Sequence, residues 1–285
     1  MSEAGGNPYQ GEDGRPTLLP SVVAWVDVLG FQHLIAGNRA PATEEEALAK
    51  FWAALSASMG ELKPLDSWVW PGPASWQVKT FTDNYVIGVP LVPDRPFRGL
   101  VELLLAANRV ARFQLKLALE GFLVRGAVAV GLVCMAEHLA FGSGLLEAYR
   151  AEGRDARDPR IILTPSATAV LDVGLRVRQL TFGEDAPHAP FWQDVDDRVF
   201  INYLSSVVEF EHDMGYPDTE TFIRHGEVVS QKLAELVADP PKAQKWAWTA
   251  RYHNEFLRHR TDFPDESRID ADRLAGALRE YRLRS

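Results

Sequence analysis

The chain has 285 residues, of which 46% are hydrophobic and 24% charged, the proportions of a soluble globular protein with one large domain or one domain and an appendage. Its net charge of −9 argues against a broad nucleic-acid-binding surface, so an anionic substrate would need a local cluster of Arg and Lys. No apolar run reaches the roughly 20 residues that span a bilayer, and we expect no membrane partner.

The single cysteine, Cys134, excludes an intrachain disulfide and a cysteine-based zinc site, and it fits a reducing cytoplasm. Residues 1–19 contain Gly, Pro and acidic residues and lack the apolar core of a signal peptide. We therefore expect a flexible N-terminal arm on a cytoplasmic protein.

The first half of the chain predicts one single strand, one strand pair and three helices. Residues 21–29 are nearly all apolar and predict a buried strand, and 31–37 predict a short helix. Acidic residues after Thr43 predict the start of a second helix that ends near Met59. Residues 75–81 and 84–90 predict a hairpin. A long helix is expected over 97–120, ended by Gly121.

The second half alternates short strands with helices and then turns helical. Residues 122–130 predict a strand, with 131–136 as a second strand that pairs with it. Helices are expected after the glycine turn at 141–144, through Glu152, and from Thr164-Pro165 to about Leu171. Short strands are expected at 160–163, 174–182 and 198–203, with a loop at 183–197. From Ser205 onward the pattern predicts helices at 218–238, 242–260 and 270–282.

This order of elements, β-α-α-β-β-α-β-β-α, predicts an α+β fold of the ferredoxin-like kind, with an antiparallel sheet and helices on one face. We expect one domain over 20–205 and a C-terminal helical extension over 206–285 packed on it. Because such a fold hosts many functions, function has to be argued from individual side chains.

Two aspartates lie where strands are expected to end. Asp27 follows the apolar run 22–26, where a carboxylate is costly to bury unless it is paired or bound to a metal ion. The alternative is that Asp27 caps the following helix. Asp83 lies in the turn Thr82-Asp83-Asn84 of the predicted hairpin. Two carboxylates at strand ends can converge on one divalent cation.

Three cationic residues each admit two interpretations. Arg125 is the only charge in the apolar run 123–131, and its alternative is a surface position or a structural ion pair. Arg150 lies on a predicted helix, where it would ordinarily be exposed and paired with Glu147 or Glu152. Lys79 begins the predicted hairpin, where a lysine is usually solvated.

Taken together, these features resemble the class III nucleotidyl cyclases, and more closely the bacterial pyrimidine cyclases of the anti-phage Pycsar systems. The resemblance covers roughly residues 20–205. It rests on Asp27-Val28-Leu29-Gly30-Phe31, Phe81-Thr82-Asp83, Arg125-Gly126 with Gly131 six residues after the arginine, and Phe141-Gly142 followed by Arg150. Their order and spacing are more specific than any one piece.

The resemblance implies two Mg²⁺ or Mn²⁺ ions per site, held by Asp27 and Asp83 with the carbonyl oxygen of Val28 as a further ligand. The implied reaction is internal: the ribose 3′-oxygen attacks the α-phosphorus of a nucleoside triphosphate, and pyrophosphate leaves. Metal ions would lower the pKa of the 3′-hydroxyl and bridge phosphoryl oxygens.

The remaining site residues also come from the resemblance. Gly30, Phe31 and Gln32 would offer backbone N–H groups to the triphosphate at a helix start. Arg125 would bind the β- and γ-phosphates. In the family these groups come from one subunit of a dimer. Two positions from the other subunit complete each site: Arg150 would stabilise charge at the α-phosphate, and Lys79 occupies the position that reads the base. We therefore expect a homodimer with shared sites.

The chain departs from the adenylyl cyclase pattern at two positions. Leu146 replaces an asparagine four residues before Arg150, and Leu139 replaces an aspartate for the adenine amino group. We therefore expect a pyrimidine cyclase that converts UTP or CTP into cyclic UMP or cyclic CMP, a second messenger in phage defence. The alternatives are a non-catalytic nucleotide-binding module on the same fold and a purine cyclase.

Other conspicuous residues are interpreted as structural. The histidines at 212, 225, 253 and 259 do not have the spacing of a helical metal pair, and we expect surface or packing roles. We expect the acidic loop that contains Asp194, Asp196 and Asp197 to be solvated.

Overall fold

The computed structural model describes residues 7–30, 41–62, 76–92, 99–182, 190–211, 214–260 and 262–270. Its main sheet runs in the order β2-β3-β1-β4-β6-β8-β7, and β5 pairs with β4 outside this path. The central strand β1 (Leu19–Val28) is antiparallel to β3 (Asn84–Pro90) on one side and to β4 (Val124–Ala136) on the other. The continuous apolar sequence of β1 fits this central position, because both of its faces are covered.

The remaining strands extend the sheet on both sides. The predicted hairpin is confirmed: β2 (Gln77–Phe81) pairs with β3 across a turn at residues 82–83. The short strand β5 (Leu139–Phe141) pairs with the end of β4, and β6 (Ile161–Leu163) lies parallel to β4. Beyond β6 come β8 (Val199–Ile201) and β7 (Phe191–Gln193), while β9 (Val208–Glu211) and β10 (Met214–Pro217) form a separate pair.

Six α-helices and three 3₁₀ helices lie within the described ranges. The α-helices are α2 (Pro41–Met59), α3 (Leu100–Leu119), α4 (Ser143–Asp155), α5 (Pro165–Phe182), α6 (Thr219–Glu235) and α7 (Pro240–Arg258). The 3₁₀ helices are η1 (Gly60–Leu62), η2 (Tyr203–Val207) and η3 (Asp265–Ser267). The predicted α+β class is therefore correct.

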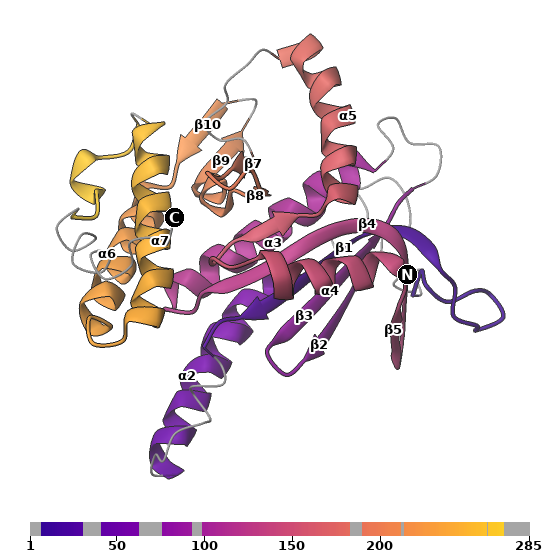
Figure 1. Ribbon diagram of the computed structural model, residues 1–285, viewed down its shortest axis with the longest axis horizontal. Coiled ribbons are helices and arrows are strands. Elements are labelled where there is room, and N and C mark those ends of the chain that lie inside the picture. Colours follow the sequence, from indigo (N-terminus) through magenta and orange to yellow (C-terminus); the bar gives the residue numbers. More distant parts are fainter. Residues whose placement is uncertain are drawn as a thin grey trace.

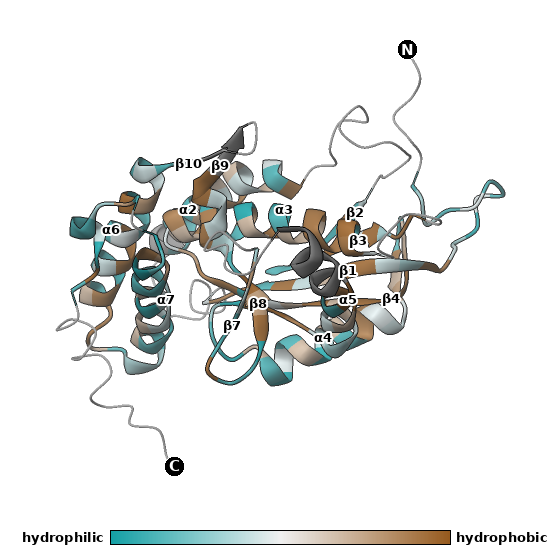
Figure 2. Ribbon diagram, turned by 90° about the horizontal axis from the view of Figure 1, so that it is seen from above, coloured by the Kyte–Doolittle hydropathy of each residue, from teal (hydrophilic) through white to brown (hydrophobic). Residues whose placement is uncertain are grey.

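Helices cover both faces of the sheet, not the one face that the sequence predicted (Figures 1 and 2). Residues of β1 alternate between two clusters: Val22 and Val26 pack toward α3, whereas Val23 packs toward Ala148 of α4. Trp25 also faces α4, where its ring meets Tyr149 at 5.1 Å between centroids. The period of two in a strand requires both faces to be covered when every residue is apolar.

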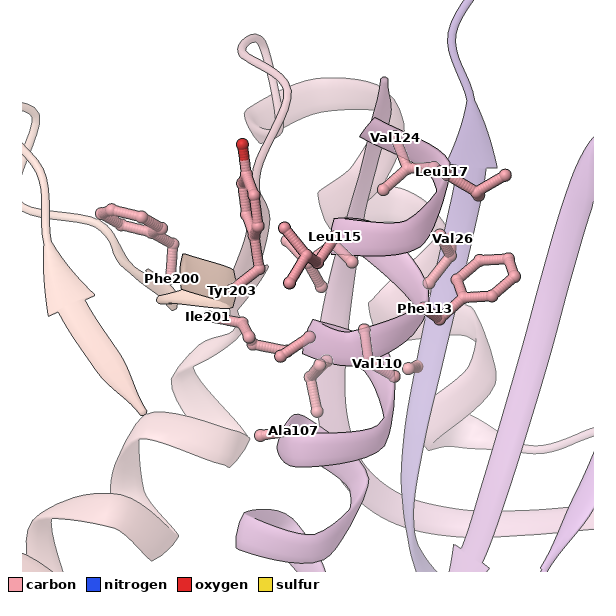
Figure 3. Packing of buried hydrophobic residues seen from close by; sticks show 14 of the residues in the cluster. Val26, Ala107, Val110, Phe113, Leu115, Leu117, Val124, Phe200, Ile201 and Tyr203 are labelled. Atoms are coloured by element: carbon pink, nitrogen blue, oxygen red, sulfur yellow. The ribbon is translucent and has the colours of Figure 1, made fainter. Parts of the chain in front are cut away.

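Helix α3 is the centre of the larger hydrophobic cluster (Figure 3). Phe113 lies on the side of Val26, and Leu115 lies on the side of Tyr203 in η2. Both Phe113 and Tyr203 are almost fully buried. Burying an aromatic side chain of this size stabilises the fold by roughly 1.5–3 kcal/mol, so α3 fixes the sheet to the segment that leads into the C-terminal helices.

The C-terminal helices pack on the end of the sheet. Leu123 and the partly buried Leu29 belong to a cluster with α6 and α7 that includes Val229, Leu233, Trp246, Ala247 and Ala250. Residues 29 and 123 follow β1 and precede β4, respectively, so the extension contacts the strand ends where the site residues lie.

Several predicted elements are wrong. Residues 174–182 continue α5 as helix, because Gly174 does not end it and Leu, Arg and Gln are good helix formers. Residues 131–136 belong to the single strand β4, and the turn comes later, before β5. The loop predicted at 183–197 contains β7, and the chain forms η2, β9 and β10 after Ile201 before it turns helical. The helices expected at 31–37 and 270–282 lie outside the described residues, except for residue 270.

None of the helices in the described ranges combines the length and apolar character that a membrane span requires.

Candidate active site

The antiparallel register of the sheet brings the first site residues together. Asp27 pairs with Arg125 of β4 on one side and with Asn84 of β3 on the other. The Nε of Arg125 lies 3.2 Å from Asp27 Oδ2. The N–H of Val28 donates to the carbonyl oxygen of Asp83 at 3.0 Å, which fixes the β2–β3 turn against the end of β1. Asp27, Asp83 and Arg125 are far apart in the sequence, and they meet at one end of the strands of the sheet.

The electrostatics of Asp27 reflect this crowding. Its side chain is 15% exposed, and burial raises the pKa of the carboxyl group. Arg125 lowers that pKa, and the negative charge of Asp83 raises it. Neighbouring carboxylates are stabilised when a cation lies between them.

The donor set at this end of the strands suits a hard divalent cation, because carboxylate and main-chain oxygens are the ligands that Mg²⁺ and Mn²⁺ prefer. Within the described ranges, no group of three or more His, Cys, Asp or Glu side chains could hold a metal ion. A metal ion here would therefore depend on Asp27, Asp83 and main-chain oxygens such as that of Val28.

A third carboxylate, Glu152 of α4, was missed from the sequence as a site residue. It is 6% exposed, and its Oε1 lies 2.7 Å from Arg125 Nε. Burial raises the pKa of Glu152; Arg125 lowers it, and Asp27 and Asp83 raise it further. Glu152 follows Leu145 and Ala148 on the sheet-facing side of α4, and this spacing of three and four residues was the available signal.

Gly30 is the first of the three residues whose N–H groups were expected to contact phosphate. Its φ of 88° lies in the left-handed region, and an added Cβ would meet no atom within 4 Å. The requirement for glycine is therefore conformational and not a matter of space. Phe31 and Gln32 lie outside the described residues.

Arg150 is not brought to Asp27 within one chain. It is exposed on α4 and lines a pocket of about 380 Å³ together with Glu147, Arg154 and Arg198. The predicted alternative partners are engaged elsewhere: Glu152 pairs with Arg125, and Glu147 accepts from the N–H of Ser166 at 3.3 Å. Arg150 and Glu152 lie about 200° apart around the helix, so they face different surroundings.

Lys79 is also separate from the aspartates. It lies on the edge strand β2, and its ammonium group donates to the carbonyl oxygen of Glu137 in the β4–β5 turn. Leu139 and Leu146, the two departures from the adenylyl cyclase pattern, are both exposed, on β5 and α4.

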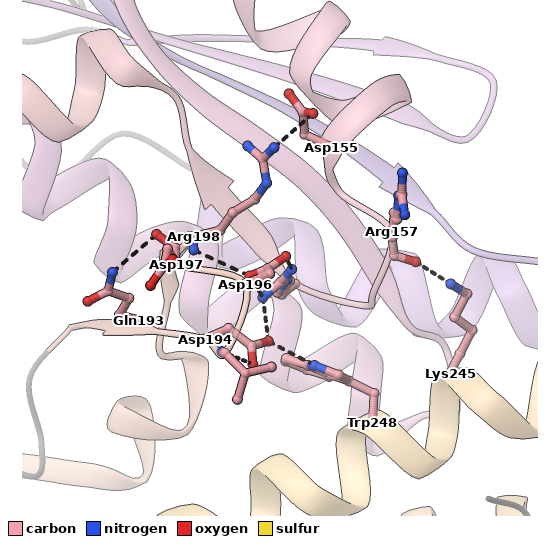
Figure 4. A network of polar contacts seen from close by, with 11 residues as sticks. Asp155, Arg157, Gln193, Asp194, Asp196, Asp197, Arg198, Lys245 and Trp248 are labelled. Atoms are coloured by element: carbon pink, nitrogen blue, oxygen red, sulfur yellow. Dashed lines mark hydrogen bonds and ion pairs between the residues drawn. The ribbon is translucent and has the colours of Figure 1, made fainter. Parts of the chain in front are cut away.

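The sequence predicted a solvated acidic loop, and this prediction is wrong for two of its three aspartates. Asp194 and Asp196 form ion pairs with the buried Arg160, and Trp248 Nε1 donates to Asp194 at 3.1 Å (Figure 4). The guanidinium group of Arg160 requires this pairing because its side chain is only 2% exposed. This cluster is structural: it joins the β7–β8 turn to α7.

The chain matches no protein-family model and no curated protein sequence. Among solved structures it is similar to the monomeric guanylyl cyclase domain of the RhoGC fusion protein from Blastocladiella emersonii, with 18% identity over 65% of this chain and 95% of that one, at a TM-score of 0.38. It is also similar to the adenylyl cyclase CyaB from P. aeruginosa, with 11% identity over 70% of this chain and 98% of that one, at 0.43.

A third similar structure is the catalytic core of a rhodopsin-guanylyl cyclase with converted specificity in complex with ATPαS. The identity is 19% over 54% of this chain and 83% of that one, with a TM-score of 0.34. At these identities and scores the likeness assigns no role to any residue of this chain, and roles have to come from its own geometry.

Proposed function

We propose that this protein is a metal-dependent nucleotide cyclase that converts UTP or CTP into 3′,5′-cyclic UMP or cyclic CMP and pyrophosphate. The observation that carries the proposal is that Asp27, Asp83 and Arg125 meet at one end of the strands of the sheet. Two carboxylates and a guanidinium group, from three different strands or turns, give ligands for cations beside a donor for phosphate. The resemblance to the Pycsar cyclases supports a role of the product as a second messenger in phage defence.

The proposed roles follow from position and charge. Asp27, Asp83 and the Val28 carbonyl hold the Mg²⁺ or Mn²⁺ ions, which when bound lower the pKa of the ribose 3′-hydroxyl and neutralise phosphoryl charge. Arg125 binds the β- and γ-phosphates. The bond from the 3′-oxygen to the α-phosphorus forms as the bond to the bridging oxygen of pyrophosphate breaks, and the hydroxyl proton passes to water.

The backbone at residues 30–32 supplies N–H groups to the triphosphate in this proposal. The left-handed conformation of Gly30 supports it, because it turns the chain sharply after the end of β1. A helix start, which the sequence predicts at 31–37, offers several N–H donors to one anion.

A second copy of the chain completes each site. Arg150 and Lys79 lie away from Asp27 in one chain. In this proposal the partner subunit delivers them, Arg150 to the α-phosphoryl oxygens and Lys79 to the base. Exposed apolar side chains on neighbouring elements support a homodimer interface: Leu132 on β4, Leu139 and Phe141 on β5, and Leu146 and Tyr149 on α4. Exposed apolar residues gathered in this way favour protein contact.

The choice of a pyrimidine rests on Leu139 and Leu146. Neither side chain can donate or accept a hydrogen bond, so a site that includes them lacks partners for the adenine amino group. Lys79 is a donor without acceptor capacity and can meet the O2 or O4 of uracil or the O2 or N3 of cytosine.

The test is incubation of the purified protein with each of the four nucleoside triphosphates and Mn²⁺, with products identified by mass spectrometry. We expect cyclic UMP or cyclic CMP. A cyclic purine nucleotide as product would show that the protein is a purine cyclase. The absence of any cyclic product would favour the non-catalytic nucleotide-binding module.

Asp27→Asn and Asp83→Asn should each abolish product formation, because an amide is a neutral and weaker ligand for Mn²⁺ than a carboxylate. The matched control is Asp265→Asn at an aspartate whose side chain is 96% exposed, which should retain full activity. Full activity of either site variant at modest Mn²⁺ would remove the metal assignment. Circular dichroism checks that each variant is folded.

A further inference from the structure

The C-terminal helices contact both strand ends that carry the candidate site. Leu29 comes two residues after Asp27, and its N–H donates to the carbonyl oxygen of Leu123 at 2.8 Å. Leu29 and Leu123 pack together on Trp246 and neighbouring residues of α6 and α7. The position of α7 is therefore fixed relative to Asp27 and Arg125 through direct packing.

Lys245, next to Trp246 on α7, reaches toward the site. Its ammonium group donates to the carbonyl oxygen of Arg157, in the segment between α4 and β6 (Figure 4). The same segment is bonded to β4 beside Arg125, because the N–H of Gly126 donates to the carbonyl oxygen of Arg160 at 3.2 Å. Lys245 and Arg125 therefore lie close to one short stretch of backbone.

The charge of Lys245 is incompletely compensated. Burial lowers the pKa of its ammonium group, Asp158 raises it, and Arg125 is close enough to lower it further. Among the contacts of the described residues, Lys245 has a main-chain carbonyl as its hydrogen-bond partner and forms no ion pair. Arg125, by contrast, is in contact with both Asp27 and Glu152.

A partly desolvated ammonium beside a guanidinium is stabilised by an anion that can reach both groups. A chain of phosphates carries several charges and can contact Arg125 and Lys245 together.

We propose that Lys245 of the C-terminal extension binds the terminal phosphates of the ligand together with Arg125, so that the extension supplies part of the binding site. The identity of the ligand as a nucleoside triphosphate rests on the function proposed above. The role of Lys245 itself rests on the placement of α7 and would apply to any polyphosphate bound at Arg125.

The experiment compares the affinity of wild type and Lys245→Gln for inorganic tripolyphosphate by calorimetry at a fixed Mg²⁺ concentration. Loss of one charge-assisted hydrogen bond should weaken binding by about tenfold or more. Lys245→Arg should restore most of the affinity because it keeps the charge. The matched control is Lys242→Gln, one turn earlier on α7 and paired with Asp239, which should bind as wild type does.

Two outcomes overturn the proposal: wild type that does not bind tripolyphosphate, or Lys245→Gln that binds it as tightly as wild type. An equal loss in Lys242→Gln would overturn it as well, because the effect would then be the general charge of α7.

The same proteins are assayed for cyclisation, which separates this proposal from the proposed function. Wild type that binds tripolyphosphate through Lys245 but forms no cyclic nucleotide would end the proposed function and support the role of Lys245. A cyclase whose Lys245→Gln variant keeps wild-type KM and tripolyphosphate affinity would end the role of Lys245 and support the function.

Discussion

Arg125 lies between two carboxylates, one on β1 and one on α4. Its Nε is 3.2 Å from Asp27 and 2.7 Å from Glu152. Asp27 would give up part of this contact in order to bind a cation, and Glu152 would then keep the guanidinium group in place. The shared guanidinium thus links metal binding at Asp27 to the position of Arg125.

We expect Glu152→Gln to raise the Mn²⁺ concentration for half-maximal activity by about tenfold, the lower end of the effect of losing a residue behind a metal ligand. Without the Glu152 charge, Arg125 pairs more strongly with Asp27 and competes with the cation. Glu152→Asp, which keeps the charge, should recover part of the wild-type value. The measurement is a Mn²⁺ titration of initial rates, and a Glu152→Gln titration that superimposes on wild type would contradict this role.

At the scale of elements, α4 and β4 approach each other through two glycines. A Cβ at Gly131 of β4 would lie 2.9 Å from both the N and the Cα of Gly144 on α4. Because α4 carries Glu152 toward the sheet and Arg150 away from it, this close contact sets the positions of both side chains.

Gly131→Ala should therefore destabilise the protein by about 1–3 kcal/mol, the usual cost of overpacking, because backbone has to move. Gly153→Ala, also on α4, is the matched control: an added Cβ there meets nothing within 4 Å, and alanine should stabilise the helix by about 0.5–1 kcal/mol. Urea unfolding measures both changes. Equal effects of the two substitutions would show that the close contact with α4 is not responsible.

At the scale of the whole molecule, a buried hydrogen-bonded chain joins the sheet domain to the C-terminal helices. Tyr203 Oη lies 2.8 Å from His225 Nε2, the two histidine Nδ1 atoms are 3.0 Å apart, and His253 Nε2 lies 2.9 Å from the carbonyl oxygen of Ser267. Because that carbonyl only accepts, His253 carries its proton on Nε2, His225 donates from Nδ1, and the Tyr203 hydroxyl donates to His225.

The hydrogen bonds that link Tyr203, His225, His253 and Ser267 require both histidines to be neutral. Burial lowers the pKa of His253 from 6.5 to about 4; the hydrogen bond to Ser267 raises this pKa and Arg268 lowers it. The pKa of His225 is also lowered, first by burial and then by His253. The unfolded chain therefore binds protons between pH 6.5 and about 4 that the folded chain does not. The stability from His253 is complete above pH 6.5 and is lost as pH falls toward 4, by about 3 kcal/mol.

Urea unfolding at pH 7, 6, 5 and 4.5 measures this loss. Ring resonances of His225 and His253, assigned through single Asn variants, should show no protonation in the folded protein above pH 5. Titration of either ring near pH 6.5 with the fold intact would contradict the neutral chain.

The proposed homodimer makes a further prediction at this scale. Asp27→Asn and Arg150→Ala subunits, each inactive as homodimers, should recover activity when mixed, because one site of the heterodimer then contains neither change. Rates are measured after subunit exchange, with heterodimer formation checked by differently tagged chains. Heterodimers without activity would count against a site shared between subunits.

The sequence alone located the residues whose signals are local. The apolar run that ends at Asp27, the hairpin turn at Asp83 and the strand around Arg125 all appear where they were predicted, because strand periodicity and turn residues act over a few positions. The expected metal and phosphate roles of these residues remain predictions.

Only the tertiary structure decided which side chains meet across long separations. Glu152 looked like a partner for Arg150, yet the packing of α4 on β4 turns it toward Arg125. The acids at 194 and 196 looked solvated until the buried Arg160 was placed beside them. Lys245 had no signal at all, because its position depends on how α7 packs against Leu29 and Leu123. Such contacts depend on burial and packing between elements, and local sequence patterns carry neither.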